Sequence, residues 1–396
     1  MSFTSIPVLD LSLASSPTTK PAFLADLRSA LMEVGFLYLK NVGIPDSLFA
    51  SAISHGRAFF DLPLDEKLKI EMKNAPSFLG YSRLSAEVTA GAVDHREQID
   101  LSTEHVVPTA PGTPRYYNLL GPNQWPDEAA LPGFRDTFTA YMKAMGAVSM
   151  RFTALVAEAI GLPASAFERY FERNVQDQQH KLKIVKYPDV GELGADGAAR
   201  QGVGPHKDSM YTSYLLQASG HRGLQVQNLR GDWVDCPPVD GTLVVAIGQG
   251  LEALTGGVCA STTHRVLSPA AGEGARFSIP FFQGVRLDTE FEELEKAGLG
   301  RAVPEEVREQ RRKVLLEGSG ERLDDVEFTF RTGGVATTLG EATLRNRVKS
   351  HPDVGERWYP DILASIREEQ RIAGRQGAGT STAPGVDKLR GDAQAV

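Results

Sequence analysis

The sequence predicts a mostly β protein, an antiparallel sandwich or barrel with helices around it. The main observation is a series of short segments between residues 181 and 285 that are rich in β-branched and aromatic residues and bounded by Gly, Pro or Asp. Segments with helical periodicity precede and follow this region. The predicted strands are KLKIVKYP (181–188), SMYTSYLLQ (209–217), GLQVQNL (223–229), DWVDCPP (232–238), TLVVAIG (242–248), STTHRVLS (261–268) and RFSIPFFQ (276–283).

The region before these strands is mixed and rich in helices. A strand is expected at 6–12, and a helix at 21–34, where Leu24, Leu27, Leu31 and Val34 recur at helical spacing. A strand, GFLYLKN, follows at 35–41, and the next helix must end before the Leu62–Pro63 step because the residue before a proline disfavours helical backbone. A further helical region is predicted over 133–172.

The segments that flank the strands are polar. Residues 189–204 are rich in glycine and predict a mobile loop, and their spacing does not fit a dinucleotide-binding G-x-G-x-x-G pattern. The charged stretch 292–318 predicts a solvated helical segment, and a closing helix is expected at 359–372. The tail from Gly374 is polar and rich in glycine, which predicts disorder.

Composition excludes several classes of function. The net charge of −8 leaves no basic stripe for a nucleic acid backbone, and no apolar run is long enough to span a bilayer. The N-terminus lacks the pattern of a secretory signal, so we expect a cytoplasmic protein. Because only Cys236 and Cys259 occur, a disulfide framework is not expected and both thiols should be reduced. Since no secretory signal is present, Arg230-Gly231-Asp232 is interpreted as a hairpin turn and not as an adhesion motif.

Three residues have the chemistry of a metal site. His206 and Asp208 stand two positions apart in what looks like the start of a strand, so both side chains should leave the same face. His264 projects from a later predicted strand. Two imidazoles and one carboxylate on one side of an ion suit Fe(II) with open positions for other ligands, although zinc accepts the same ligand types.

The next predicted strand carries a candidate acid-binding pair. Arg276 and Ser278 are again two positions apart and share a face. A guanidinium presents a fork of donors that matches a carboxylate, and a nearby hydroxyl adds a further hydrogen bond. The pair predicts a site for an acid inside the β structure.

The order H-x-D, then His, then R-x-S resembles the Fe(II)- and 2-oxoglutarate-dependent dioxygenases of the isopenicillin N synthase-like group. IPVLDLS, GFLYLKNVGIP, FFDLPLDEK and GYSR are similar to the family's N-terminal region, in the same order, and the resemblance covers about residues 6–285. The sequence departs from the family at Lys207, expected to point away from the metal face, and at Gln249, which puts one loop hydrogen bond in doubt.

The resemblance implies a distorted double-stranded β-helix (jelly roll) with flanking helices. It implies that His206, Asp208 and His264 hold Fe(II), that Arg276, Ser278 and Tyr187 bind the co-substrate 2-oxoglutarate, and that O2 is the oxidant. It divides the chain into an N-terminal α/β region (1–120), a helical scaffold (121–180), the jelly-roll core (181–290), a C-terminal helical and strand extension (291–373) and a tail (374–396).

The expected reaction is oxidation of a small, fairly apolar organic molecule, such as a natural-product intermediate, with release of succinate and CO2. Hydroxylation, desaturation, ring closure and ring expansion are all compatible with the sequence. Two alternatives stay open: an iron-dependent oxidase of the same fold that does not use 2-oxoglutarate, and a metal-holding binding protein without turnover. The predicted substrate contacts are Phe282, Met210, Tyr211 and Tyr214.

Overall fold

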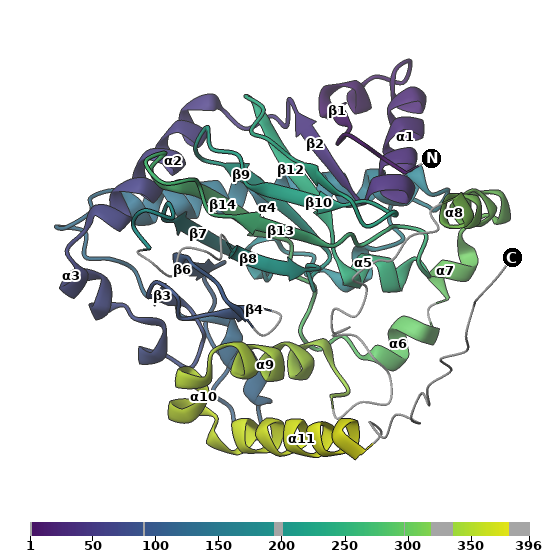
Figure 1. The fold of residues 1–396 in the computed structure, drawn as a ribbon. Coiled ribbons are helices and arrows are strands. Elements are labelled where there is room, and N and C mark those ends of the chain that lie inside the picture. The colour runs from purple at the N-terminus through teal and green to yellow at the C-terminus, as the bar shows by residue number, and fades with distance from the viewer. Residues whose placement is uncertain (1, 90–91, 194–200, 297, 318–335, 380–396) are drawn as a thin grey trace, which may run out of the picture.

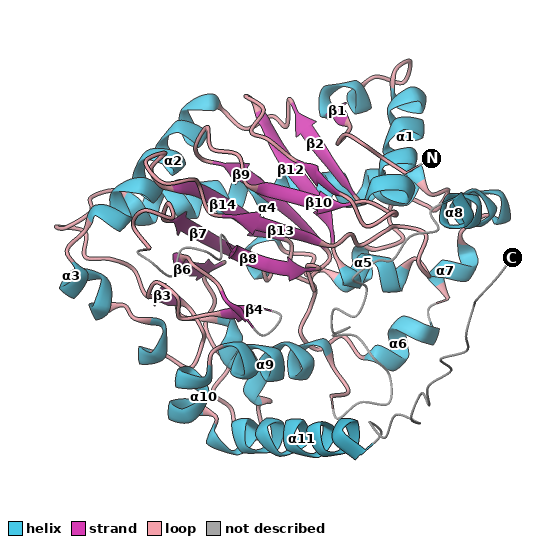
Figure 2. Ribbon diagram, in the orientation of Figure 1, coloured by secondary structure: helices cyan, strands magenta, loops and turns pink. Residues whose placement is uncertain are grey.

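A computed structural model of the chain describes residues 2–89, 92–193, 201–296, 298–317 and 336–379 (Figure 1). Two facing β-sheets form the centre, and helices surround them (Figure 2). Among the described residues, no helix combines the length and the apolar character that crossing a bilayer requires.

The larger sheet has eight strands, and all neighbouring pairs except the first are antiparallel. Its central strands match the predicted ones, and apolar residues on both of their faces are buried, against the smaller sheet on one side and the helices on the other. In spatial order the strands are β1 (Val8–Asp10), β2 (Phe36–Lys40), β12 (Thr242–Ile247), β9 (Thr212–Gln217), β14 (Arg276–Phe282), β7 (Lys181–Tyr187), β6 (Glu97–Ser102) and β3 (Gly80–Ser82).

The smaller sheet faces this one and completes the sandwich. Its order is β11 (Trp233–Asp235), β10 (Leu224–Gln227), β13 (His264–Leu267) and β8 (Gln201–His206), all antiparallel. Apolar side chains from both sheets, among them Val185, Val226, Val244 and Val266, form one buried cluster between them. The turn that carries Arg230-Gly231-Asp232 joins β10 to β11, as expected from the sequence.

Helices cover the outer face of the larger sheet and share its main apolar core. These are α1 (Lys20–Ser29), α2 (Asp46–Asp61) and α4 (Phe134–Ala159), and α2 ends just before Leu62–Pro63 as predicted. The short helices α3 (Leu64–Lys69), α5 (Gln249–Leu254), α6 (Phe291–Lys296) and α7 (Leu299–Ala302) and the longer α8 (Glu305–Glu317) lie in the connections.

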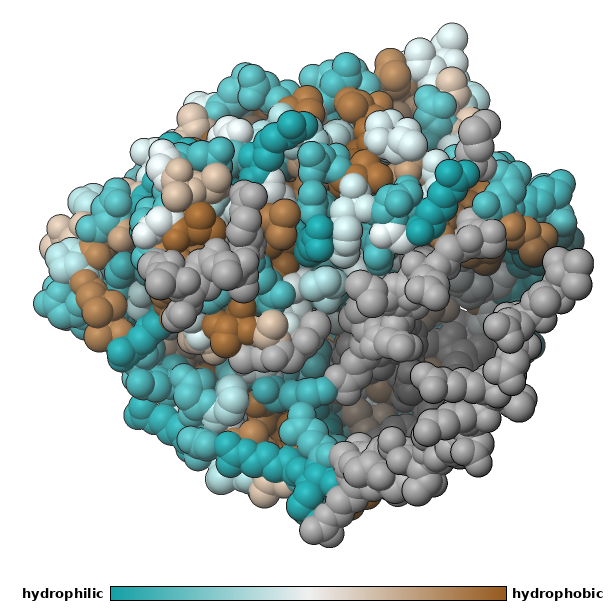
Figure 3. Space-filling model, in the orientation of Figure 1, coloured by the Kyte–Doolittle hydropathy of each residue, from teal (hydrophilic) through white to brown (hydrophobic). Residues whose placement is uncertain are grey.

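Three C-terminal helices form a separate layer beside β3, β4 (Val88–Thr89) and β6 (Figure 1). They are α9 (Leu339–Ser350), α10 (Pro352–Trp358) and α11 (Pro360–Gly379). Their inner faces share an apolar cluster with the 115–120 segment that includes Tyr116, Leu344 and Tyr359. Their outer surface, exposed at Arg367, Glu368 and nearby polar residues of α11, is hydrophilic in Figure 3.

Three sequence predictions are wrong in detail. The end of the predicted loop 189–204 is β8 from Gln201 onward; the short strand escaped notice because two of its six residues are glycine. The last helix continues to Gly379, into the segment where a tail was predicted from Gly374. Strand β6 was also missed, because its alternate polar residues Gln98, Asp100 and Ser102 face a buried polar layer and not water.

Candidate metal centre

Three potential metal ligands lie close together where β8 ends and β13 begins. His206 ends β8 and His264 begins β13, and the two residues are directly opposite each other in the antiparallel ladder. Each Nε2 lies 3.7 Å from Oδ1 of Asp208, and one ligand atom from each of the three residues lies within 4.8 Å of the others. The structure therefore brings together the three residues that the sequence singled out.

Asp208 reaches this position from a turn and not from a strand. β8 stops at His206 and β9 begins at Thr212, so the argument from strand alternation does not apply to this pair. Backbone N–H groups at the start of α5 hold the turn: Gln249 donates to the Asp208 carbonyl at 2.8 Å, and Gly248 donates to the Tyr211 carbonyl at 3.0 Å. A Cβ at Gly248 would lie 1.9 Å from the Met210 carbonyl oxygen, so only glycine fits here.

The expected consequences of the two family departures change accordingly. The backbone of Gln249 makes a hydrogen bond to this turn whatever its side chain. Lys207, which a strand would have turned away, is among the residues that border the cavity described below.

Both imidazoles are oriented to offer Nε2 to a metal. Nδ1 of His206 lies 2.8 Å from the Gly204 carbonyl, and Nδ1 of His264 lies 3.1 Å from the Thr262 carbonyl. A carbonyl only accepts, so Nδ1 carries the proton and Nε2 keeps its lone pair. Burial, together with the nearby His264, lowers the pKa of His206 to about 3, which keeps this ring neutral at physiological pH.

The donor set fits a divalent iron. Two imidazoles and one carboxylate occupy one side of the site, and the Ser213 hydroxyl donates to Asp208 Oδ2, which orients that carboxylate. This facial arrangement leaves positions open toward the cavity, as non-haem Fe(II) centres require.

Arg276 supplies a buried guanidinium that has no acid partner in the part of the chain that the structure describes. Its side chain is 1% exposed, and Nη2 donates a hydrogen bond to the Gln217 side chain at 3.2 Å. Among the described residues, Nε and Nη1 have no hydrogen-bond partner. Burying such donors is costly unless a ligand accepts their hydrogen bonds, so this geometry fits a carboxylate of 2-oxoglutarate.

The other two predicted co-substrate residues lie beside Arg276. Tyr187 is directly opposite it on β7, and the guanidinium carbon is 5.1 Å from the centre of the tyrosine ring. Ser278, 1% exposed, lies on the same face of β14. All three residues border one cavity with the metal ligands.

That cavity has a volume of about 300 Å³, at the lower end of the range for small-molecule sites. Phe282 and Met210, two of the four predicted substrate contacts, border it. The structure does not bring Tyr211 and Tyr214 there: Tyr211 packs against Phe167 and Phe171, and Tyr214 is likewise a core residue on the far face of β9. Aromatic character alone did not distinguish the two faces.

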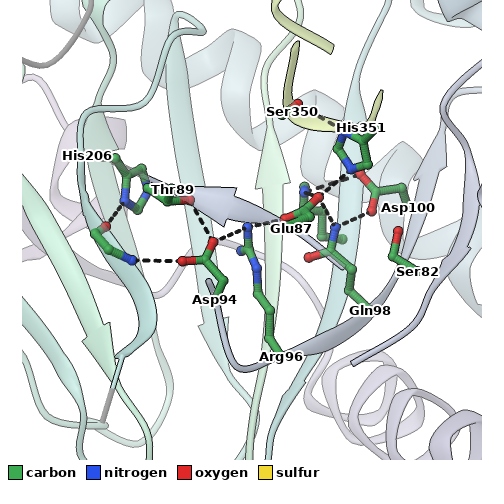
Figure 4. A network of polar contacts seen from close by, with 12 residues as sticks. Ser82, Glu87, Thr89, Asp94, Arg96, Gln98, Asp100, His206, Ser350 and His351 are labelled. Atoms are coloured by element: carbon green, nitrogen blue, oxygen red, sulfur yellow. Dashed lines mark hydrogen bonds and ion pairs between the residues drawn. The ribbon is translucent and has the colours of Figure 1, made fainter. Parts of the chain in front are cut away.

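A buried polar network, not anticipated from the sequence, extends from the metal centre to the C-terminal helices (Figure 4). Asp94 accepts a hydrogen bond from the Gly204 backbone at 3.1 Å and lies 3.3 Å from Arg96 Nη2. Arg96 also pairs with Glu87, and Glu87 lies 2.5 Å from Nε2 of His351, which follows α9. The only sequence signal was the density of charged residues over 94–100, because the partners are far apart in the chain.

Electrostatics in this network favour the charged form of Glu87. Burial opposes its ionisation, but Arg96, Lys183 and His351 outweigh burial and hold the pKa of Glu87 well below its usual range. For Asp94 burial prevails over Arg96, and its pKa is raised. The network thus ties the end of β8, and so His206, to the C-terminal layer.

Comparison with known proteins places the chain in a family. Residues 6–128 match the family described as non-haem dioxygenase in morphine synthesis N-terminal, and residues 178–285 match the 2OG-Fe(II) oxygenase superfamily. The chain is 64% identical over 376 residues to the "2-oxoglutarate-dependent dioxygenase frbJ" of Dothideomycetidae sp. (strain 11243), covering 94% of this chain and 98% of that protein. It is 31% identical to "Homoarginine-6-hydroxylase 2-ODD-C23" of Glycine max, over 74% and 89% of the two chains.

Solved structures of related proteins support the same assignment. A full-length Neurospora crassa protein in complex with alpha-KG superposes with a TM-score of 0.60 at 26% identity, covering 72% of this chain and 86% of that one. The complex of that protein with alpha-KG and thymine gives 0.64 at 22% identity, over 87% and 96%, which supports the jelly-roll fold. The chain belongs to the Fe(II)- and 2-oxoglutarate-dependent oxygenases, a family that requires Fe(II), 2-oxoglutarate and O2.

Proposed function

We propose that His206, Asp208 and His264 hold the catalytic Fe(II) and that Arg276 binds the far carboxylate of 2-oxoglutarate. The observation that supports this most strongly is that a three-ligand cluster and a buried guanidinium with unpaired donors border the same cavity. Ser278 and Tyr187 complete the acid-binding end, since each is next to Arg276 on the β7–β14 ladder.

When bound, the iron would supply oxidation of a C–H bond at the expense of O2 and 2-oxoglutarate. In a hydroxylation, one oxygen atom enters the product and the other enters succinate as CO2 leaves. The residues of this chain orient the reactants: Gly204 and Thr262 fix the imidazoles, and Ser213 fixes the carboxylate. The walls of the cavity exclude bulk water from the reacting atoms.

The substrate that fits this cavity is a small organic molecule with a largely apolar body. Phe282 and Met210 lie where its body would pack. The net charge of −8 and the size of the cavity favour a small molecule over a nucleic acid or a membrane as the partner. We place the enzyme in the cytoplasm, in keeping with two buried, unpaired cysteines, Cys236 and Cys259.

Oxygen uptake and succinate release test this function together. The Fe(II)-loaded protein with carbon-labelled 2-oxoglutarate is expected to consume O2 and form succinate in equal amounts, slowly in the absence of the primary substrate. The His264→Ala variant, with intact circular dichroism, should do neither. Iron-dependent oxygen uptake without succinate would identify an oxidase of the same fold, and no uptake would favour a binding protein.

A further inference from the structure

The wall of the cavity formed by the segment before β6, by β7 and by α9 carries an excess of positive charge that neither the metal nor 2-oxoglutarate accounts for. Apart from Lys207, which lies between the metal ligands His206 and Asp208 in the chain, four cationic side chains border this part of the cavity. They come from the segment before β6, from β7 and from α9, and they are Arg96, Lys181, Lys183 and Arg347.

Two of these cations form ion pairs with buried carboxylates. Arg96 pairs with Glu87 and Asp94, and Lys183 lies 3.5 Å from Glu87 and 3.4 Å from Asp100. All three carboxylates are buried, with side chains at most 7% exposed. Four cations against three carboxylates leave one positive charge in excess.

The excess charge is concentrated at Lys181 and Arg347. Lys181 donates a hydrogen bond to the Leu119 carbonyl and makes no ion pair with any described residue. Arg347 has one acid within reach among the described residues, Asp100 at 3.4 Å, which it shares with Lys183. Burial, reinforced by Arg347, outweighs the attraction of Asp100 and lowers the pKa of Lys181 to about 7. A bound anion would favour the protonated amine.

Strand register separates this pair from the co-substrate end of the cavity. Arg276 is opposite Tyr187 on β7, whereas Lys181 is opposite Phe282, six residues farther along the same ladder. At about 3.3 Å per residue, Arg276 and Lys181 are therefore roughly 20 Å apart along the strands. One small diacid does not span both.

The same register brings Lys181 close to the metal. Phe282 lies opposite Lys181 on one side and Ser213 on the other, so the three residues form one row across β7, β14 and β9. Neighbouring strands are about 4.8 Å apart, which places Lys181 about 10 Å from Ser213. Ser213 binds the metal ligand Asp208, so a small molecule at the metal can reach this amine.

The second member of the pair comes from outside the part of the chain that matches the family, which ends at residue 285. A capping box of Thr338 and Glu341 starts α9. Thr343, Arg347 and Ser350 follow at helical spacing and all border the cavity. The C-terminal layer therefore presents a polar face to the substrate end.

We propose that Lys181 and Arg347 bind a carboxylate of the primary substrate, so that the enzyme oxidises a small organic monoacid. This inference rests on the proposed function, because it assigns the molecule oxidised at the same metal. One negative charge balances the excess, and the amine and the guanidinium supply the donors that a carboxylate accepts.

The test measures binding to the anaerobic protein loaded with Fe(II) and saturated with 2-oxoglutarate, which blocks Arg276. The probes are small monocarboxylic acids, each paired with its primary amide of the same shape, and affinity is measured by titration calorimetry. In the native protein, acids that bind should do so at least about tenfold more tightly than their amides. In Lys181→Met and in Arg347→Gln this preference should fall below about threefold.

Lys186→Met is the matched control. Lys186 lies on the same strand, β7, but faces the other way and pairs with Glu97 at 3.6 Å, so this variant should keep the full preference for acids. Equal binding of acids and amides, binding of no acid at all, or a preference that survives in both cavity variants would overturn the inference. Failure of 2-oxoglutarate itself to bind would instead overturn the proposed function.

Discussion

The two ends of the cavity handle charge in opposite ways. At the co-substrate end, one guanidinium, Arg276, is buried among apolar side chains of the sandwich and has no acid partner among the described residues. At the other end, Lys181, Lys183 and Arg347 belong to a network of cations, continued by Arg96, that is set against the buried acids Glu87, Asp94 and Asp100.

The difference shows how one fold combines a fixed reaction with a particular substrate. The co-substrate end is made from strands of the jelly roll, whose register fixes Arg276 against Tyr187. The substrate end also draws on α9 and on the residues around β4 and β6, at the edge of the sandwich. The substrate end therefore depends on elements outside the jelly-roll strands.

Loss of a metal ligand should have the largest effect, because it removes the centre that both ends serve. We expect Asp208→Ala to lower turnover at least about a thousandfold, since the remaining imidazoles leave the ion without its carboxylate. Succinate formation and bound iron, measured together, check this. Near-native iron content with near-native turnover would contradict the ligand assignment.

Removing the guanidinium should disable only the co-substrate end. Arg276→Gln loses a charge-assisted, two-donor interaction worth about 3 kcal/mol, so the Kd of 2-oxoglutarate should rise roughly a hundredfold. Fe(II) affinity should stay within about threefold of native. Arg265→Gln is the control, because Arg265 stacks on Trp233 away from the cavity and should leave both affinities unchanged.

Removing a buried acid should weaken the other end and the fold together. Glu87→Gln leaves Arg96 and Lys183 without their shared acid, so the free energy of unfolding should fall by about 3 kcal/mol. Because the pKa of Glu87 is lowered in the folded state, its stabilisation is fully present above the unfolded pKa of 4.5 and is lost as the pH falls from there through the folded pKa. Urea unfolding at neutral pH and again well below the unfolded pKa should therefore show a smaller difference between native and variant in acid.

Lys181 should leave a signature at alkaline pH. Its folded pKa of about 7 is below the unfolded value, so the unfolded chain binds more protons between these values and stability rises with pH. Relative to Lys181→Met, the native protein should gain up to about 1.4 kcal/mol per pH unit above the folded pKa. Identical pH dependence of unfolding in the two proteins would show that Lys181 is not an unpaired buried amine.

The smallest effect is expected at a residue that the sequence assigned to the cavity and the structure places in the core. The Tyr211 hydroxyl is buried and has no hydrogen-bond partner among the described residues. Tyr211→Phe should therefore change the free energy of unfolding by no more than about 0.5 kcal/mol and leave turnover unchanged. A large loss of turnover would restore it as a substrate contact.

The sequence was sufficient for the parts of the site that lie on regular strands. The shared face of Arg276 and Ser278 was predictable from strand alternation, and Tyr187, which the family resemblance assigned to the co-substrate, lies opposite Arg276. His206 and Asp208 were correctly paired for a partly wrong reason, since a turn held by α5 places the aspartate. Spacing cannot reveal such a turn.

The charged contacts at the substrate end could not be predicted from the sequence, for a different reason. Contacts such as Glu87 with His351 and Asp100 with Arg347 join residues that are far apart in the chain, on opposite sides of the jelly-roll region. Neither periodicity nor a short motif carries information on such pairs. The packing of α9 against the edge of the sandwich creates them, and only the folded chain shows that their charges do not cancel.

The most direct test of the division between the two ends is an anaerobic titration of the metal-free protein with Fe(II) and then 2-oxoglutarate, following the weak visible charge-transfer band of the chelated keto acid. We expect the band in the native protein and in Lys181→Met at similar 2-oxoglutarate concentrations, and its loss or a shift to far higher concentrations in Arg276→Gln. A band that survives in Arg276→Gln and disappears in Lys181→Met would reverse the assignment of the two ends.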